Sequence, residues 1–200
     1  MRGERMQYPD NLDEEKAMKR WREAIQQASS LISSIFEDGK LKVMTDDELS
    51  DELMKRGVSY DDLEDVIDEA QRKKLITIDY NTWSAYFWIP PERREEEKQK
   101  TEKLEKLVEE AFVERNTEKL SENELKEILA SKGLSAEDVR RAIYEAERDC
   151  ILSSYPFTKK GWVYELIPRE DRGEEPERRR LGKLYDIRWI YEKLSRGLKV

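Results

Sequence analysis

Basic and aromatic residues that could contact a nucleic acid gather in the second half of the chain. They are Arg140, Arg141, Tyr144, Arg148, Lys159 and Lys160. The spacing of the first four would place them on one face of a helix, and the two lysines precede a glycine in a predicted turn. Arginine and lysine bind phosphate oxygens, and arginine also reaches base edges in the major groove. This pattern predicts contact with duplex DNA.

The same arginines have an alternative explanation. Arg140 and Arg141 have acidic neighbours within three or four positions. These neighbours are Glu137, Asp138, Glu145 and Glu147. Side chains at this spacing meet on a helix surface and form ion pairs. A salt-bridged surface helix without a ligand is therefore also compatible with the sequence.

A second basic group lies near the C-terminus. Residues 176–200 contain eight basic and three acidic residues, a net charge of +5, and include the run Arg178, Arg179 and Arg180. An arginine run of this kind can contact phosphates. It can equally pair with the acidic face of the first repeat, within one chain or between two chains. The sequence leaves both possibilities open.

The first half of the chain has an acidic helix instead. Asp61, Asp65 and Asp68 share one predicted helix face, together with Glu64 and Glu69. Carboxylates repel phosphates, so this face is expected to bind a protein partner with a basic surface rather than DNA. A bound cation is conceivable. A solvated acidic face is the simpler alternative.

These helices lie at matching positions of an internal repeat. Thr45–Ile76 and Ser121–Leu152 align without a gap at a shift of 76 residues. Each copy begins with a capping box, continues to a glycine that ends the first helix, and is followed by a serine that is expected to cap the next helix. Two short β segments follow in each copy, and the second of them ends in Ile-Pro. An internal repeat of this size indicates two similar units.

The flanking sequence completes a mainly helical α+β organisation with small β wings. We expect a loose N-terminus at residues 1–12 and a first domain with a long N-terminal helix at 13–91. A helical linker follows at 92–103. The second domain covers 104–168, and a linker with a basic C-terminal helix covers 169–200.

Two further surfaces are candidates for protein contacts. Met18, Trp21 and Ile25 belong to an apolar stripe on the N-terminal helix, in the half without a counterpart in the repeat. That half is expected to face the second repeat or a second chain, which predicts a possible homodimer. Phe87 lies on the outer face of the first wing, where the second copy has Glu165. An aromatic residue there is typical of an interface or of a packed core.

Composition argues against several functional classes. The chain has no histidine and one cysteine, so histidine-based triads, Cys/His zinc sites and disulfides are excluded. No glycine-rich phosphate loop is present, and we expect no enzyme activity, cofactor or metal. No apolar run approaches the length of a membrane span, which predicts a cytoplasmic protein without membrane contact. Charged residues make up 42% of the chain, which fits either a thermophilic source or an ordinary solvated helical protein.

The order helix, short strand, helix, turn, helix and two-stranded wing in both copies resembles the winged-helix family. The resemblance covers roughly residues 28–90 and 104–168 and implies two tandem winged-helix domains. Many members bind duplex DNA with the third helix in the major groove, and a minority bind proteins. The resemblance therefore implies a non-catalytic DNA-associated protein in transcription regulation or chromosome maintenance. Its second domain and basic tail would contact DNA, while its first domain makes protein contacts. The alternative is a protein–protein scaffold of the same fold that binds no DNA.

Overall fold

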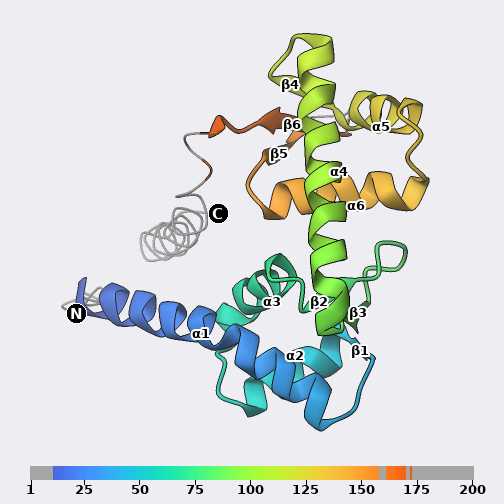
Figure 1. The fold of residues 1–200 in the computed structure, drawn as a ribbon. Helices are drawn as coiled ribbons and strands as arrows, with labels where there is room; N and C mark the ends of the chain where they lie inside the picture. Colours follow the sequence, from blue (N-terminus) through green and yellow to red (C-terminus); the bar gives the residue numbers. More distant parts are fainter. Residues whose placement is uncertain (1–10, 158–160, 170–171, 173–200) are drawn as a thin grey trace, which may run out of the picture. The chain divides into compact units, whose positions relative to one another are not determined.

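The computed structural model describes residues 11–157, 161–169 and 172 of the 200-residue chain. The chain divides into two compact units, Met1–Arg94 and Glu95–Val200. Each unit is mainly helical and contains one small antiparallel sheet, which confirms the predicted α+β class (Figure 1).

The first unit begins with the long helix α1. Its elements are α1 (Asn11–Asp38), β1 (Val43–Thr45), α2 (Asp46–Lys55), the 3-10 turn η1 (Tyr60–Asp62), α3 (Leu63–Arg72), β2 (Ile76–Ile78), β3 (Ala85–Trp88) and the 3-10 turn η2 (Pro91–Arg93). The strands form an antiparallel sheet in the order β1-β3-β2, with Val43 and Thr77 both opposite Phe87. The strand that precedes α2 therefore pairs with the second strand of the hairpin.

The second unit repeats this order. Its elements are α4 (Arg94–Arg115), whose first residue closes the first unit, β4 (Lys119–Ser121), α5 (Glu122–Ser131), α6 (Ala136–Arg148), β5 (Leu152–Phe157) and β6 (Gly161–Leu166). The sheet order is β4-β6-β5, and Lys119 and Ser153 both lie opposite Glu165. Both units thus have the same strand order and register.

Local signals in the sequence account for the helix boundaries. Thr45 and Ser121 each accept a hydrogen bond from the backbone N–H three residues later, and Glu48 and Glu124 accept from the capping residues in return. Both predicted capping boxes are confirmed. Because these bonds favour the charged carboxylate, they hold the pKa of Glu48 and of Glu124 below the usual value.

One predicted cap is wrong. Ser135 caps α6 by accepting a hydrogen bond from the Asp138 N–H, but Ser59 makes no such bond. Its hydroxyl donates instead to the Asp62 carboxylate at 2.5 Å, and the chain passes through a 3-10 turn before α3 begins. The same sequence pattern therefore starts the third helix in two different ways.

Each core is built from repeat-equivalent side chains. Ile32 and Phe36 of α1 are buried in the first unit, and Val108 and Phe112 of α4 take their places in the second. The latter two belong to a cluster that also contains Leu125, Leu129, Ala142 and Ala146. These core positions of the first and fourth helices are therefore apolar in both copies.

The repeat extends beyond the aligned stretches. Arg94 Nε donates to the carbonyl of Ile89 at 3.1 Å, and Arg172 Nε donates to the carbonyl of Ile167 at 2.9 Å. Both arginines stand five residues after the isoleucine of an Ile-Pro pair. In each unit this contact holds the chain that follows the hairpin, and it was not recognised from the sequence. Of the helices in the described part of the chain, none is both long and apolar enough to cross a membrane.

Replacing Gly57 or Gly133 with alanine should lower the free energy of unfolding by about 1–2 kcal/mol, because a side chain is strained at positive φ. The two glycines have φ of +93° and +88°, and an added Cβ would meet no atom within 4 Å. The loss is therefore conformational rather than steric. Asparagine at the same positions is the control and should cost less, because it tolerates this region better. Urea unfolding followed by circular dichroism measures both, and alanine variants as stable as wild type would contradict the explanation.

Candidate interaction surfaces

The N-terminal half of α1 packs against the third helix of its own unit. Trp21 is 7% exposed, and its indole Nε1 donates a hydrogen bond to the Asp65 carboxylate of α3 at 3.0 Å. Met18 is also buried, and Ile25 is half-buried. The expectation that this stripe faces outside its own repeat is therefore wrong at Trp21. The stripe packs on the third helix because the structural repeat begins upstream of the stretches that align in sequence.

This contact changes the acidic surface of α3. Asp65 faces α1, whereas Asp61 and Glu64 remain exposed and Asp68 is half-buried. The acidic face is narrower than the sequence suggested. Its binding of a basic protein partner stays a prediction, carried by Asp61 and Asp68.

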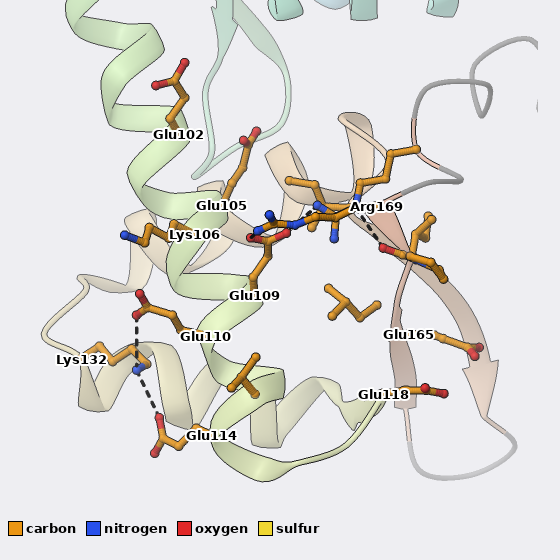
Figure 2. A pocket seen from close by; sticks show the side chains of 16 residues that line it. Glu102, Glu105, Lys106, Glu109, Glu110, Glu114, Glu118, Lys132, Glu165 and Arg169 are labelled. Carbon is orange, nitrogen blue, oxygen red and sulfur yellow. Dashed lines mark hydrogen bonds and ion pairs between the residues drawn. The ribbon is translucent and has the colours of Figure 1, made fainter.

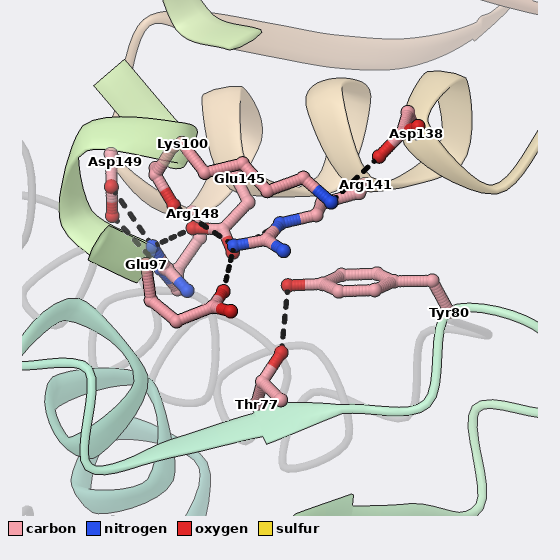
Figure 3. Close-up of polar contacts among 10 residues, drawn as sticks. Thr77, Tyr80, Glu97, Lys100, Asp138, Arg141, Glu145, Arg148 and Asp149 are labelled. Carbon is pink, nitrogen blue, oxygen red and sulfur yellow. Dashed lines mark hydrogen bonds and ion pairs between the residues drawn. The ribbon is translucent and has the colours of Figure 1, made fainter. Parts of the chain in front are cut away.

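The corresponding region of the second unit contains a buried ionic network between α4 and α6 (Figure 3). Arg141 is 7% exposed, and its guanidinium Nη2 donates to the Glu97 carboxylate of α4 at 2.8 Å and approaches the Thr101 hydroxyl at 3.4 Å. Its Nε lies 3.7 Å from Glu145. The first half of α4 is therefore part of the second unit and not a polar linker.

Arg148 belongs to the same network. Its guanidinium pairs with the Glu145 carboxylate and with Asp149, the latter at 2.9 Å, and the side chains of Arg148 and Glu145 are each 2% exposed. The expectation that Arg141 and Arg148 lie on an exposed helix face is wrong. Their charges are neutralised by carboxylates in the interior, where a charge without a partner is costly.

Lys100 of α4 makes a further ion pair at the start of α6. Its Nζ lies 3.0 Å from the Asp138 carboxylate. Hydrogen bonds from Lys100 and from Ser135 hold the pKa of Asp138 below its usual value despite partial burial. The folded state therefore gains stability from this group above the unfolded-state pKa and loses it as the pH falls through the folded-state pKa.

The contacts of the two units occupy equivalent positions. A shift of 76 residues converts Trp21 and Asp65 into Glu97 and Arg141. The first helix thus contacts the third helix at the same place in both copies. In the first unit an indole of the first helix donates to a carboxylate of the third, and in the second unit a carboxylate of the first helix pairs with an arginine of the third. The same shift converts the Glu69–Arg72 pair of α3 into the Glu145–Arg148 pair of α6.

The other residues that were predicted to contact nucleic acid lie either on α6 or outside the described residues. Arg140 and Tyr144 are half-buried on α6. Lys159, Lys160, Arg178, Arg179 and Arg180 lie outside the described residues. Of the predicted basic side chains in the described part, Arg140 alone is not buried.

The outer faces of the two sheets differ in chemistry. In the first unit, Val43 and Phe87 are paired across β1 and β3 and are 47% and 42% exposed, with Leu41 nearby in sequence at 41%. In the second unit the equivalent pair is Lys119 and Glu165, which form an ion pair at 3.3 Å. We call Leu41, Val43 and Phe87 the apolar sheet face. Phe87 was predicted from the sequence and Val43 was not. Inward and outward side chains alternate along each of the two neighbouring strands, and this alternation could have placed Val43 on the same face as Phe87.

A groove of about 1150 Å³ lies within the second unit, between α4 and the chain that follows β6 (Figure 2). Glu109 reaches across it to Arg169 at 2.9 Å and to Arg172 at 2.5 Å. Burial opposes ionisation of Glu109, but the hydrogen bonds from Arg172 and Arg169 outweigh it and hold its pKa below the usual value. This groove was not predicted from the sequence.

No protein-family model, curated protein or solved structure matches the chain. Within the described residues, no three histidine, cysteine, aspartate or glutamate side chains are arranged to hold a metal ion.

Changing Arg141 to alanine should lower the free energy of unfolding by about 3–5 kcal/mol, because Glu97 would lose its counter-charge and Glu145 would lose one of its two. Arg140→Ala is the matched control, one residue away on the same helix, and should cost less than about 1 kcal/mol. Denaturant unfolding gives both values. Similar losses for the two variants would contradict the assignment of Arg141 to a buried network.

Removing the ring of Trp21 should destabilise the first unit without changing the oligomeric state. Trp21→Ala deletes a buried aromatic side chain and should cost about 3–5 kcal/mol. Trp21→Phe retains most of the apolar contact, loses the N–H donor to Asp65, and should cost about 1–3 kcal/mol. Unfolding curves and sedimentation velocity test this together. A stable Trp21→Ala variant with a changed sedimentation coefficient would instead make the stripe an intermolecular contact.

Proposed function

We propose that the chain is a non-catalytic scaffold that binds other proteins through two winged-helix units. One observation carries the proposal: in both units the first helix binds the third helix through equivalent residues, at Trp21–Asp65 and at Glu97–Arg141. These third-helix residues were expected to be available to a ligand. A helix that is held from this side has less surface to insert into a DNA groove.

The topology supports the winged-helix assignment. Each unit has the order helix, strand, helix, helix and hairpin, and the first strand pairs with the far strand of the hairpin. In DNA-binding members of this family the third helix lies in the major groove. The surface chemistry of that helix therefore separates a DNA-binding unit from a protein-binding one.

The charges favour a protein ligand. Phosphate binding depends on basic side chains that can exchange counterions for phosphates. Arg141 and Arg148 are buried and paired with carboxylates, and the first unit has exposed acidic residues at Asp61 of η1 and Glu64 of α3. Contact of Arg140 and Tyr144 with DNA stays a prediction, but these two residues provide one positive charge.

The apolar sheet face is the surface that we assign to the partner. Exposed apolar side chains at adjacent strand positions, as at Val43 and Phe87, are typical of protein contacts. The second unit replaces this pair with Lys119 and Glu165, so the fold does not require apolar residues here. The partner should therefore present apolar side chains to the first unit.

Replacing Val43 and Phe87 with serine should abolish binding of a cellular protein partner and leave the fold intact, because both side chains are substantially exposed. The test is quantitative affinity purification of the full chain with mass spectrometry. Tyr60→Ser is the control, since Tyr60 is 80% exposed and lies in η1 rather than in the sheet. We expect at least a tenfold loss of one partner with the double variant and no loss with the control.

A duplex mobility-shift titration across salt concentrations tests the competing function. The scaffold proposal predicts no duplex affinity that depends on Arg140. Tight, salt-sensitive binding that is lost in Arg140→Ala would overturn the scaffold proposal, as would a set of protein partners that is identical for the wild type and for the Val43→Ser/Phe87→Ser variant.

A further inference from the structure

The groove of the second unit combines an excess of carboxylates with an apolar surface. Seven glutamates line it, against two lysines and two arginines. Both arginines pair with Glu109, and Lys132 lies 3.1 Å from Glu114 and 3.9 Å from Glu110. Counting these four basic side chains and also Lys119, which pairs with Glu165, two negative charges remain. Such a surface attracts a cationic ligand.

Apolar residues line the same groove. Ile151, Leu166, Ile167 and Pro168 contribute to it, and Val113 of α4 is 75% exposed at its wall. Small inorganic cations gain nothing from these side chains. A ligand that uses both features has positive charges together with apolar side chains, as a basic peptide segment with apolar residues has.

The first unit fills the equivalent region with its own side chain. Trp88 stands at the position of Leu166, and its ring stacks on Phe36 at 5.5 Å between centroids. The Arg94 guanidinium lies 4.9 Å from the centre of the same ring. Leucine cannot make these ring contacts, and Val113 of the second unit replaces the charged Glu37 of the first. The second copy has therefore exchanged an internal aromatic contact for a more open, partly apolar surface.

We propose that residues 176–197 of the same chain bind in this groove. The sequence from Pro176 to Val200 has a net charge of +5 and combines its basic residues with large apolar ones. These apolar residues are Leu181, Leu184, Tyr185, Ile187, Trp189, Ile190, Tyr191 and Leu194. The segment therefore matches the groove in charge and in its apolar content.

The place where the described chain ends supports this intramolecular occupant. Arg172 itself lines the groove and is held there by Glu109 and by the Ile167 carbonyl. Pro176 follows four residues later, and four extended residues span about 13–14 Å. A short tether raises the effective concentration of a ligand to the millimolar range, which a separate basic peptide would have to match in solution. The inference is independent of the apolar sheet face and of its partner.

Hydrogen–deuterium exchange on the full chain tests the proposal. Amides of residues 181–196 should exchange at least tenfold more slowly than expected for an unstructured segment. Glu102→Lys/Glu110→Lys changes two exposed groove residues and should remove this protection. Glu96→Lys/Glu127→Lys is the matched control, because it makes the same charge change at exposed positions outside the groove lining. Protection of core amides in α5 and α6 reports whether each variant is folded.

A charge exchange provides the second readout. Adding Arg179→Glu and Arg180→Glu to the groove variant should restore protection of the segment at least in part, because the polarity of the pair is then reversed. Three outcomes would overturn the proposal: a segment without protection in the wild type, equal protection in the groove variant and the wild type, or protection that rises with protein concentration. The last outcome would assign the groove to the segment of a second copy.

Discussion

The contact between the first and third helices determines which surfaces each unit can offer. At Trp21–Asp65 it consists of one hydrogen bond beside a buried ring, and at Glu97–Arg141 it consists of an ion pair in the interior. Buried ions gain little net stability from pairing, yet loss of one partner is costly. The second unit therefore needs α4 to remain on α6 so that Arg141 and Glu97 keep each other as counter-charges. This requirement makes the first turns of α4 part of the fold.

Short-range signals explain why much of the fold could be predicted. The capping boxes at Thr45 and Ser121 and the glycines at 57 and 133 act within a few residues of chain, so their sequence patterns determine local geometry. Periodic apolar residues likewise identify the core-facing sides of the helices. Ser59 is an instructive failure. Its hydroxyl donates to the Asp62 carboxylate just as Ser135 donates to Asp138, but only Ser135 also accepts a helix N–H, and a 3-10 turn precedes α3 whereas α6 begins directly. Energies of such alternatives differ too little for a pattern to decide between them.

The burial of charged residues was much harder to predict. Arginine is mostly a surface residue, so Arg141 and Arg148 were assigned to an exposed face by their type. The burial of Arg141 depends on Glu97, which lies 44 residues earlier, in a stretch whose high charge favours a linker. A signal was present in the repeat: the shift of 76 that aligns the two copies also aligns Trp21 with Glu97 and Asp65 with Arg141. Extending the alignment upstream would have suggested that these two pairs occupy one structural position.

Conservation of the interior and divergence of the surface give the two units the same fold with different outer faces. The Val43–Phe87 pair and the Lys119–Glu165 pair have the same sheet register, so backbone geometry does not distinguish the two outer faces. An apolar partner that fits the first face would leave the Lys119–Glu165 ion pair desolvated on the second. A free-energy penalty for binding at the wrong site discriminates between two surfaces as effectively as a more favourable binding free energy at the right site. The groove of the second unit follows the same logic, because the replacement of Trp88 by Leu166 removes an internal contact from one copy only. The repeat therefore provides a similar apolar core twice, and differences at equivalent surface positions give each copy a separate surface.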